Sequence, residues 1–297
     1  MRRAGEALLL SASDLVGHLD CHHLTVLDLA VANGALKKPT VFDPLLDVLL
    51  ERGVVHERKY LEHLRATGCQ VVEIDRAGEP EVQAEESIDT MRAGADVIVQ
   101  AVFLRDRWSG RADFLKRVEG ESVLGAWSYE VIDTKLARRT KGSTILQLCL
   151  YADLLSSIQG RLPEFMHVVA PGSGYEPQSF RTASYSAYYR QAKKGFERFL
   201  AERAAEQTYP EPNEHCELCR WRTRCDARRR ADDHLCLVAG ISKLQISELK
   251  RREIGTVVGP MGRFVRKPAI ADFDHSRHVT RAKIRVAAGR PANSSSP

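Results

Sequence analysis

The chain has 297 residues, which is enough for one large domain or two smaller ones with a substantial core. Hydrophobic residues make up 43% of it and charged residues 28%, as in soluble globular proteins, and no apolar run is long enough to cross a membrane. The composition therefore excludes a membrane-spanning protein and predicts a cytoplasmic one with no membrane partner. The net charge of +5 permits an anionic partner without requiring one.

The first helix is predicted from its start signal. Ser11–Leu15 carries Ser and Asp ahead of an apolar run, which is typical of a helix N-terminus. The stretch Leu15–Leu29 that follows is mostly apolar, and a lone cysteine there, such as Cys21, is normally a small core residue. We interpret His22 and His23 as surface or packing histidines, because adjacent positions on a helix point in different directions.

A second helical segment starts at Asp43-Pro44, with the aspartate as cap and the proline in the first turn. Four leucines are expected to form its core face: Leu45, Leu46, Leu49 and Leu50. After Gly53 a second amphipathic run contains His56, which by residue type alone is more often a surface histidine than a metal ligand.

A sheet is predicted in the middle of the chain. Ala95–Phe103 is rich in β-branched residues and indicates a first central strand, with two more antiparallel strands following up to Leu136. The flanking elements are predicted to be a strand at Cys69–Ile74, a helix at Glu85–Ala93, a helix at Thr144–Ser157, a strand at Glu164–Ala170, an edge strand at Gln178–Ala183 and a helix at Tyr188–Glu206. This pattern predicts an α/β or α+β fold.

Five polar residues lie along this sheet and the helix after it. Asp113 belongs to the alternating run Arg111–Val118. Asp133 and Lys135 are two apart in the next strand and therefore point to the same face. Gln147 and Tyr151 follow at i, i+4 on one side of a Leu-rich helix that can pack beside these strands.

This combination of residue types suits phosphate chemistry. Two carboxylates favour a hard divalent cation such as Mg²⁺, and a lysine near the attacked phosphate would add a fixed positive charge. The simpler interpretation of Asp133 and Lys135 is an exposed ion pair across strands. Their apolar neighbours Val131, Ile132 and Leu136 instead indicate a buried strand, where an unpaired charge is costly, and this favours a functional site.

The series Asp113, Asp133-x-Lys135 and Gln147-x-x-x-Tyr151 resembles that of PD-(D/E)XK nucleases of the RecB type, over most of residues 11 to 230. The resemblance implies an α/β restriction-endonuclease-like core, in which a central mixed sheet is flanked by helices. It also implies that Asp113 and Asp133 hold Mg²⁺ or Mn²⁺, and that all five residues form the catalytic site. In this family a G-x-x-H motif supplies a metal-binding histidine, and His56 occupies its place.

Three late cysteines form a second motif. The chain has seven cysteines, an odd number, which in an intracellular protein favours metal ligands or free thiols over disulfides. Cys216, Cys219 and Cys225 have C-x₂-C-x₅-C spacing within a polar stretch, so three thiolates could reach one metal centre. A fourth ligand is then needed, and a Zn²⁺ site completed by His215 is one alternative.

The resemblance supplies another alternative. Related RecB-like nucleases, among them CRISPR-associated and AddB-type exonucleases, close a [4Fe–4S] cluster with one early and three late cysteines, and Cys21 is the early cysteine here. Such a cluster would be structural and would staple the helical periphery to the core. Arginines crowd the same stretch, and they are expected to form a solvated face that also contacts phosphate.

The predicted domain organisation has three parts. Residues 1–235 form the nuclease domain with its cysteines, residues 236–254 form a short helical hairpin-like segment, and residues 255–297 form a basic, disordered tail. In some relatives a second nuclease domain follows a similar hairpin, so the tail could be a truncated extension.

The sequence thus predicts a metal-dependent deoxyribonuclease, an exonuclease acting in DNA repair, recombination or processing. Its expected partners are DNA with single-stranded character and a helicase or a second nuclease domain. Two alternatives remain: a module that binds single-stranded nucleic acid without cleaving it, and a Zn-stabilised scaffold for a helicase partner.

Overall fold

The computed structural model describes residues 1–41, 43–202, 208–259 and 263–264. The chain divides into two compact units, Met1–Thr208 and a second that begins at Tyr209. By compactness the division therefore falls earlier than the predicted domain boundary at residue 235. Each unit is described separately below.

A six-stranded mixed sheet forms the centre of the first unit, in the order β3-β4-β5-β6-β7-β8. Its strands are β3 (Val71–Glu73), β4 (Val97–Arg105), β5 (Trp108–Ser122), β6 (Gly125–Thr134), β7 (Phe165–Val169) and β8 (Gln178–Arg181). The pairs β3–β4 and β6–β7 are parallel, and the other neighbours are antiparallel. The three-stranded meander predicted up to Leu136 is confirmed.

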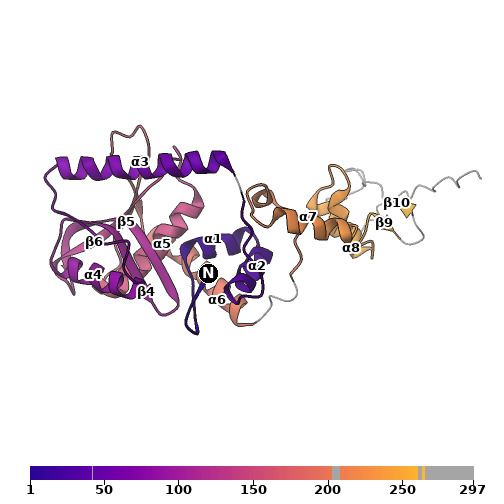
Figure 1. Ribbon diagram of the computed structural model, residues 1–297, viewed down its shortest axis with the longest axis horizontal. Helices are drawn as coiled ribbons and strands as arrows, with labels where there is room; N and C mark the ends of the chain where they lie inside the picture. Colours follow the sequence, from indigo (N-terminus) through magenta and orange to yellow (C-terminus); the bar gives the residue numbers. More distant parts are fainter. Residues whose placement is uncertain (42, 203–207, 260–262, 265–297) are drawn as a thin grey trace, which may run out of the picture. The chain divides into compact units, whose positions relative to one another are not determined.

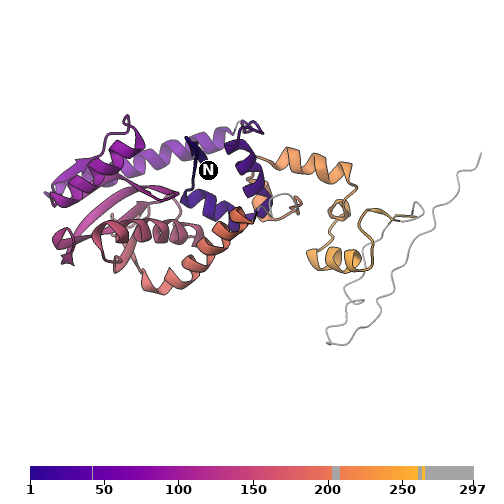
Figure 2. The same cartoon turned by 90° about the horizontal axis from the view of Figure 1, so that it is seen from below.

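Helices cover both faces of this sheet, which confirms the predicted α/β class (Figures 1 and 2). They are α1 (Ala12–Asp20), α2 (His22–Ala32), α3 (Pro44–Ala66), α4 (Pro80–Arg92), α5 (Gly142–Gln159) and α6 (Ala183–Ala201). Residues of α1, α4, α5 and α6 share the larger core with one face of the sheet. The other face packs against Tyr60, Leu61 and Leu64 of α3. A short hairpin of β1 (Arg2–Ala4) and β2 (Ala7–Leu9) precedes α1.

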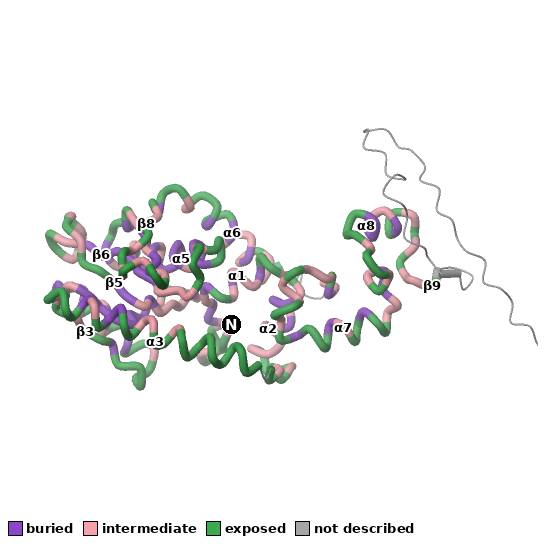
Figure 3. The backbone as a smooth tube through the Cα atoms, turned by 90° about the horizontal axis from the view of Figure 1, so that it is seen from above, coloured by how far each residue is buried: buried purple, intermediate pink, exposed green. Residues whose placement is uncertain are grey.

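The helix α3 differs from the expectation in two ways. It is one continuous helix that passes through Gly53, and Asp43 caps it by accepting hydrogen bonds from the backbone N–H groups of Leu45 and Leu46. The four leucines predicted to form its core face are exposed (Figure 3). Only the last turns of α3 reach the sheet, so apolar periodicity identified the helix correctly but not which part of it is buried.

The helix α5 is a core helix whose C-terminal end is clamped to β6. Gln159 is fully buried, and its Oε1 accepts a hydrogen bond from the Tyr129 backbone N–H at 2.8 Å. Its Nε2 donates to the carbonyl oxygens of Tyr129 at 3.3 Å and Arg161 at 2.9 Å. Gly160 then ends the helix with a left-handed φ of 67°. This clamp fixes α5 along the sheet and so fixes the face that carries Gln147 and Tyr151.

The second unit has a small core of its own. Its elements are η2 (Glu214–Glu217), α7 (Arg222–Ala231), η3 (Leu235–Leu237), α8 (Lys243–Arg251), β9 (Val258–Gly259) and β10 (Arg263–Phe264). Ile246 and Leu249, within the segment predicted as a helical hairpin at residues 236–254, pack against Leu235 just before it. Most of the predicted tail, residues 265–297, lies outside the described residues.

The sequence predicts that the arginines of α7 form a solvated face. In the structure, one of them is buried instead. Arg229 is buried, and it donates to the Pro210 carbonyl oxygen at 2.8 Å and pairs with Asp226. Arg228 pairs with Asp232. The buried Arg229 therefore stabilises the unit itself, whereas the Arg228 pair lies on the surface. In the part of the chain that the structure describes, no helix is long and apolar enough to cross a membrane.

Replacing Gln159 with Leu should destabilise the protein because Tyr129 N–H, a buried donor, would lose its partner. The expected loss is at least about 2 kcal/mol in the free energy of unfolding, measured by urea titration. Gln178→Leu is the matched control, since Gln178 is exposed and its amide accepts one surface hydrogen bond from Thr140. That change should stay within about 0.5 kcal/mol of the wild type. Equal effects of the two changes would contradict the clamp.

Candidate active site

The first carboxylate, Asp113, lies at an interruption of the β4–β5 ladder. The flanking pairs are Val99 with Phe114 and Ala101 with Ala112, whereas Gln100 and Asp113 do not pair. Gln100 has a left-handed φ of 58°, which a non-glycine residue adopts only at a cost of about 1–3 kcal/mol.

The interruption also changes which residues face the larger core. On β4, Ile98 and Ala101 both reach that core although they are three apart, and on β5 the same holds for Ala112 and Leu115. The strict alternation predicted for Arg111–Val118 is therefore broken at Asp113, because the ladder reverses its pleat there.

Neighbouring groups hold Gln100 in its strained conformation. Its Nε2 donates to Glu57 Oε1 at 2.7 Å, and its carbonyl oxygen accepts a hydrogen bond from Arg111 Nη1 at 3.3 Å. Backbone strain that the surroundings maintain is concentrated at functional sites in proteins. The interruption, within β4 and β5, thus marks the neighbourhood of Asp113 as a candidate functional site.

The second carboxylate, Asp133, is buried at the end of β6. It is 1% exposed, and the ammonium of Lys135, which is 32% exposed, lies 2.7 Å from its Oδ2. Beyond this ion pair, Oδ2 has no hydrogen-bond partner among the described residues. Gln147 Nε2 lies 3.4 Å from Oδ1 of the same carboxylate and also donates to the Tyr151 hydroxyl oxygen at 3.2 Å.

The structure therefore brings together all five residues of the predicted series. Asp113 Oδ2 accepts hydrogen bonds from the Thr134 backbone N–H at 2.9 Å and from the Thr134 hydroxyl at 3.0 Å. Burial and, next, the negative charge of Asp113 together raise the pKa of Asp133 to about 7, against the opposing effect of the Lys135 ammonium.

A third carboxylate, Glu57, faces this pair. Burial raises the pKa of Glu57, and the charge of Asp113 contributes in the same direction. The adjacent His56 instead directs its Nε2 to the Val169 carbonyl oxygen at 3.1 Å. The histidine as a metal ligand therefore stays a prediction, and its neighbour Glu57 contacts the site through Gln100 and through its charge on Asp113.

Helical phase offered a partial signal for Glu57. Positions 56, 57, 60, 61 and 64 all lie on the side of α3 that packs against the sheet, and the last three are buried there. The phase indicates both His56 and Glu57, and it cannot choose between them. Gln100 and Thr134 gave no sequence signal, because their roles depend on the ladder interruption.

The donor set at Asp113 and Asp133 fits a hard divalent cation. Two carboxylates converge, and the buried Oδ2 of Asp133 has no hydrogen-bond partner in the described chain beyond its ion pair with Lys135. Among the residues that the structure places, no three His, Cys, Asp or Glu side chains are gathered closely enough to hold a metal ion. An ion bound here would therefore draw only part of its coordination from the two aspartates, as is usual for Mg²⁺.

The cysteines are distributed over both units. Cys21 lies in the first unit, at the corner between α1 and α2, where its backbone is extended and interrupts the helix expected across this stretch. Cys216, Cys219 and Cys225 lie in the second unit, in η2, in the turn after it and in α7. The Cys216 thiol accepts a hydrogen bond from the Asn213 backbone N–H at 3.4 Å. A cluster that joins these four residues stays a prediction.

Comparison with protein families gives a match to the PD-(D/E)XK nuclease superfamily over residues 25–226. The chain belongs to this superfamily. The matched region contains the whole Asp113–Tyr151 series and the three late cysteines, and it starts after Cys21. A comparison with curated proteins found no match. PD-(D/E)XK nucleases generally use Mg²⁺ or Mn²⁺ and act on DNA, and the mixed sheet flanked by helices is consistent with their restriction-endonuclease-like fold.

The raised pKa of Asp133 gives this PD-(D/E)XK nuclease a defined pH dependence in EDTA. A carboxyl with a raised folded-state pKa contributes most stability below its unfolded value of 3.8, and that contribution is lost as pH rises through about 7. Asp133→Asn removes the ionisation. Its free energy of unfolding, relative to wild type, should therefore increase between about pH 4 and about pH 8.

Asp106→Asn is the control for this measurement, because the Asp106 side chain is 81% exposed. Its difference from wild type should stay flat over the same pH range. A flat difference for Asp133→Asn as well would show that Asp133 is not held as a neutral acid near neutral pH.

Proposed function

We propose that the chain is a Mg²⁺- or Mn²⁺-dependent deoxyribonuclease of the RecB type, acting as an exonuclease in DNA repair, recombination or processing. The observation that carries the proposal is the convergence of Asp113, Asp133 and Lys135 at the end of β6, where the buried carboxylate of Asp133 pairs with the Lys135 ammonium and interacts with the charge of Asp113. Superfamily membership supports the reaction class.

Asp113 and Asp133 would hold the ion. Glu57 lies near enough to Asp113 for the two charges to interact, so its carboxylate would add to the attraction of a cation. A bound ion of this kind lowers the pKa of its water and neutralises charge on the phosphate. Asp133 must be ionised to serve as a ligand, so ion affinity should fall as pH drops below about 7.

The remaining residues position this constellation. Lys135 is partly exposed, so its ammonium can reach both Asp133 and a phosphate outside the sheet. Gln147 links Asp133 to Tyr151 through one amide, which fixes the orientation of the buried carboxylate. Tyr151 is held in turn by the close approach of Gly110, where a Cβ would lie 2.7 Å from the tyrosine ring.

Single replacements should separate chemistry from binding. Asp113→Asn, Asp133→Asn and Lys135→Ala should each reduce cleavage of end-labelled DNA by about 100-fold or more, because each removes a charge that acts on the transition state. Binding of the same DNA in EDTA should change little. The assay compares single-stranded and duplex substrates with Mg²⁺, Mn²⁺ or EDTA, and the product ladder distinguishes exonuclease from endonuclease action.

Asp106→Asn again serves as the surface control and should cleave like the wild type. Cleavage that EDTA leaves undiminished, or full activity in Asp133→Asn, would contradict the metal-nuclease proposal. Tight binding of single strands without cleavage under any of these metals would favour a non-cleaving binding module.

We also propose that Cys21, Cys216, Cys219 and Cys225 hold a structural [4Fe–4S] cluster. All seven cysteines are free of disulfides, and three of these four are crowded into ten residues. The free thiols further support a cytoplasmic location. For a nuclease that acts on single-stranded DNA, we also propose a helicase or a second nuclease domain as partner. A Zn²⁺ site that uses His215 is the competing assignment.

Cys21→Ala tests this cluster. Anaerobically purified wild-type protein should be brown and contain about four irons per chain, and the variant should lose colour and iron and melt at a lower temperature. Cys149→Ala, at a buried core cysteine outside the proposed set, should keep its iron. Stoichiometric zinc without iron in protein never exposed to air would overturn the assignment, and iron retained in Cys21→Ala would move the fourth ligand elsewhere.

A further inference from the structure

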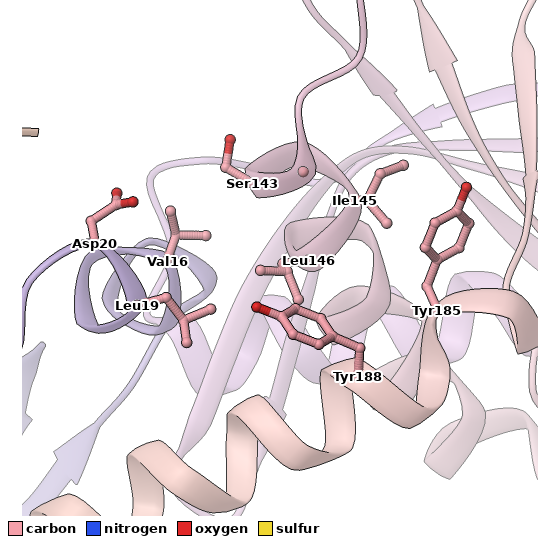
Figure 4. A pocket seen from close by; sticks show the side chains of 9 residues that line it. Val16, Leu19, Asp20, Ser143, Ile145, Leu146, Tyr185 and Tyr188 are labelled. Atoms are coloured by element: carbon pink, nitrogen blue, oxygen red, sulfur yellow. The ribbon is translucent and has the colours of Figure 1, made fainter. Parts of the chain in front are cut away.

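A cavity of about 410 Å³ opens between α1, the first turn of α5 and α6, outside the site described above (Figure 4). Its apolar lining comes from Val16 and Leu19 of α1 and from Ile145 and Leu146 of α5. Tyr185 and Tyr188 project from α6 into the same space. Its volume is in the range of small-ligand pockets, about 300–1,000 Å³.

The cavity continues the line of the candidate active site along α5. Ser143 lines the cavity, Gln147 contacts Asp133, and Tyr151 contacts Gln147. These three positions follow each other at i, i+4 and i+8, so they share one side of the helix. One helical turn rises about 5.4 Å, and this separates the cavity wall from the residue that contacts the catalytic carboxylate. A strand bound at Asp133 and Lys135 therefore has the cavity within reach of its next one or two nucleotides.

The segment that leads from Lys135 to the cavity is cationic. Arg138, Arg139 and Lys141 lie between β6 and α5, are exposed, and form no ion pair with any described carboxylate. Their positive charge is therefore available to an anionic ligand. Cations along a path beside aromatic side chains are the combination by which proteins bind single-stranded nucleic acid.

We propose that this cavity receives one unstacked base of single-stranded DNA, adjacent to the phosphate at Asp133 and Lys135, while Arg138, Arg139 and Lys141 contact the connecting phosphates. Tyr188 is the main stacking partner, because 60% of its surface is exposed, which leaves its ring open to a base. A base in a duplex is paired and stacked on both sides and cannot enter. The proposal rests on the nuclease function proposed above, and it names the substrate as a single strand.

The test measures binding in EDTA, so that its outcome does not depend on cleavage. A fluorescent single-stranded oligonucleotide and a blunt duplex of the same sequence are titrated by anisotropy with wild type, Tyr188→Ala and Tyr188→Phe. Tyr188→Ala should weaken single-strand binding about 5- to 100-fold and leave duplex binding unchanged, whereas Tyr188→Phe keeps the ring and should bind like wild type. Leu162→Ala, at a surface residue away from the cavity, is the matched control.

Two further readouts locate the base and the phosphates. In oligonucleotides that carry 2-aminopurine at successive positions, one position should be quenched by wild type and recover its fluorescence with Tyr188→Ala. Joint replacement of Arg138 and Arg139 by Gln should lower the slope of log K against log salt by about 0.7 for each lost contact.

Equal binding of single strands by wild type and Tyr188→Ala, or an equal loss on single strands and duplex, would overturn the base pocket. If the protein fails to cleave DNA but Tyr188→Ala shows the selective loss, the nuclease proposal fails and the base pocket stands. If it cleaves DNA and Tyr188→Ala binds like wild type, the base pocket fails alone.

Discussion

The arrangement of the first unit depends on one buried carboxylate. Asp133 is almost wholly removed from solvent beside a second carboxylate, so its ionised form is disfavoured both by burial and by repulsion from Asp113. Lys135 and Gln147 offset only part of this cost, and one oxygen remains without a hydrogen-bond partner among the described groups. A cation between the two aspartates would offset both the repulsion between the carboxylates and the cost of burying them. This arrangement therefore suits a metal ion, but without one it destabilises the fold.

Other parts of the fold maintain this unfavourable arrangement of two neighbouring carboxylates. The left-handed Gln100 interrupts the β4–β5 ladder opposite Asp113, and Arg111 and Glu57 hold it there. At the far end of α5, the buried amide of Gln159 ties the helix to β6. Local strain at the site is thus supported by a well-packed core elsewhere, so the chemistry and the stability reside in different residues.

The helix α5 contributes to both the candidate active site and the neighbouring cavity. One side of it carries Gln147 and Tyr151 at the aspartates, and the same side reaches the tyrosine-lined cavity one turn earlier. The cationic segment that enters this helix connects the two places. For this member of the PD-(D/E)XK nuclease superfamily, we propose that the cavity and the cationic segment bind a base and phosphates next to the candidate active site. Preference for a single strand would then follow from the geometry of one helix.

The sequence by itself determined the central strands, the helix after them and the residue pairs within these elements. Period-two spacing put Asp133 and Lys135 on one strand face, and i, i+4 spacing put Gln147 and Tyr151 on one helix side, because these relations depend only on local backbone geometry. Only the tertiary structure decided the relations between elements. The ladder interruption at Asp113, the contact of Glu57 with Gln100, and the exposure of the first half of α3 all depend on which surfaces meet. Local periodicity assigns a residue to a face, whereas its partner is set by packing between segments far apart in the chain.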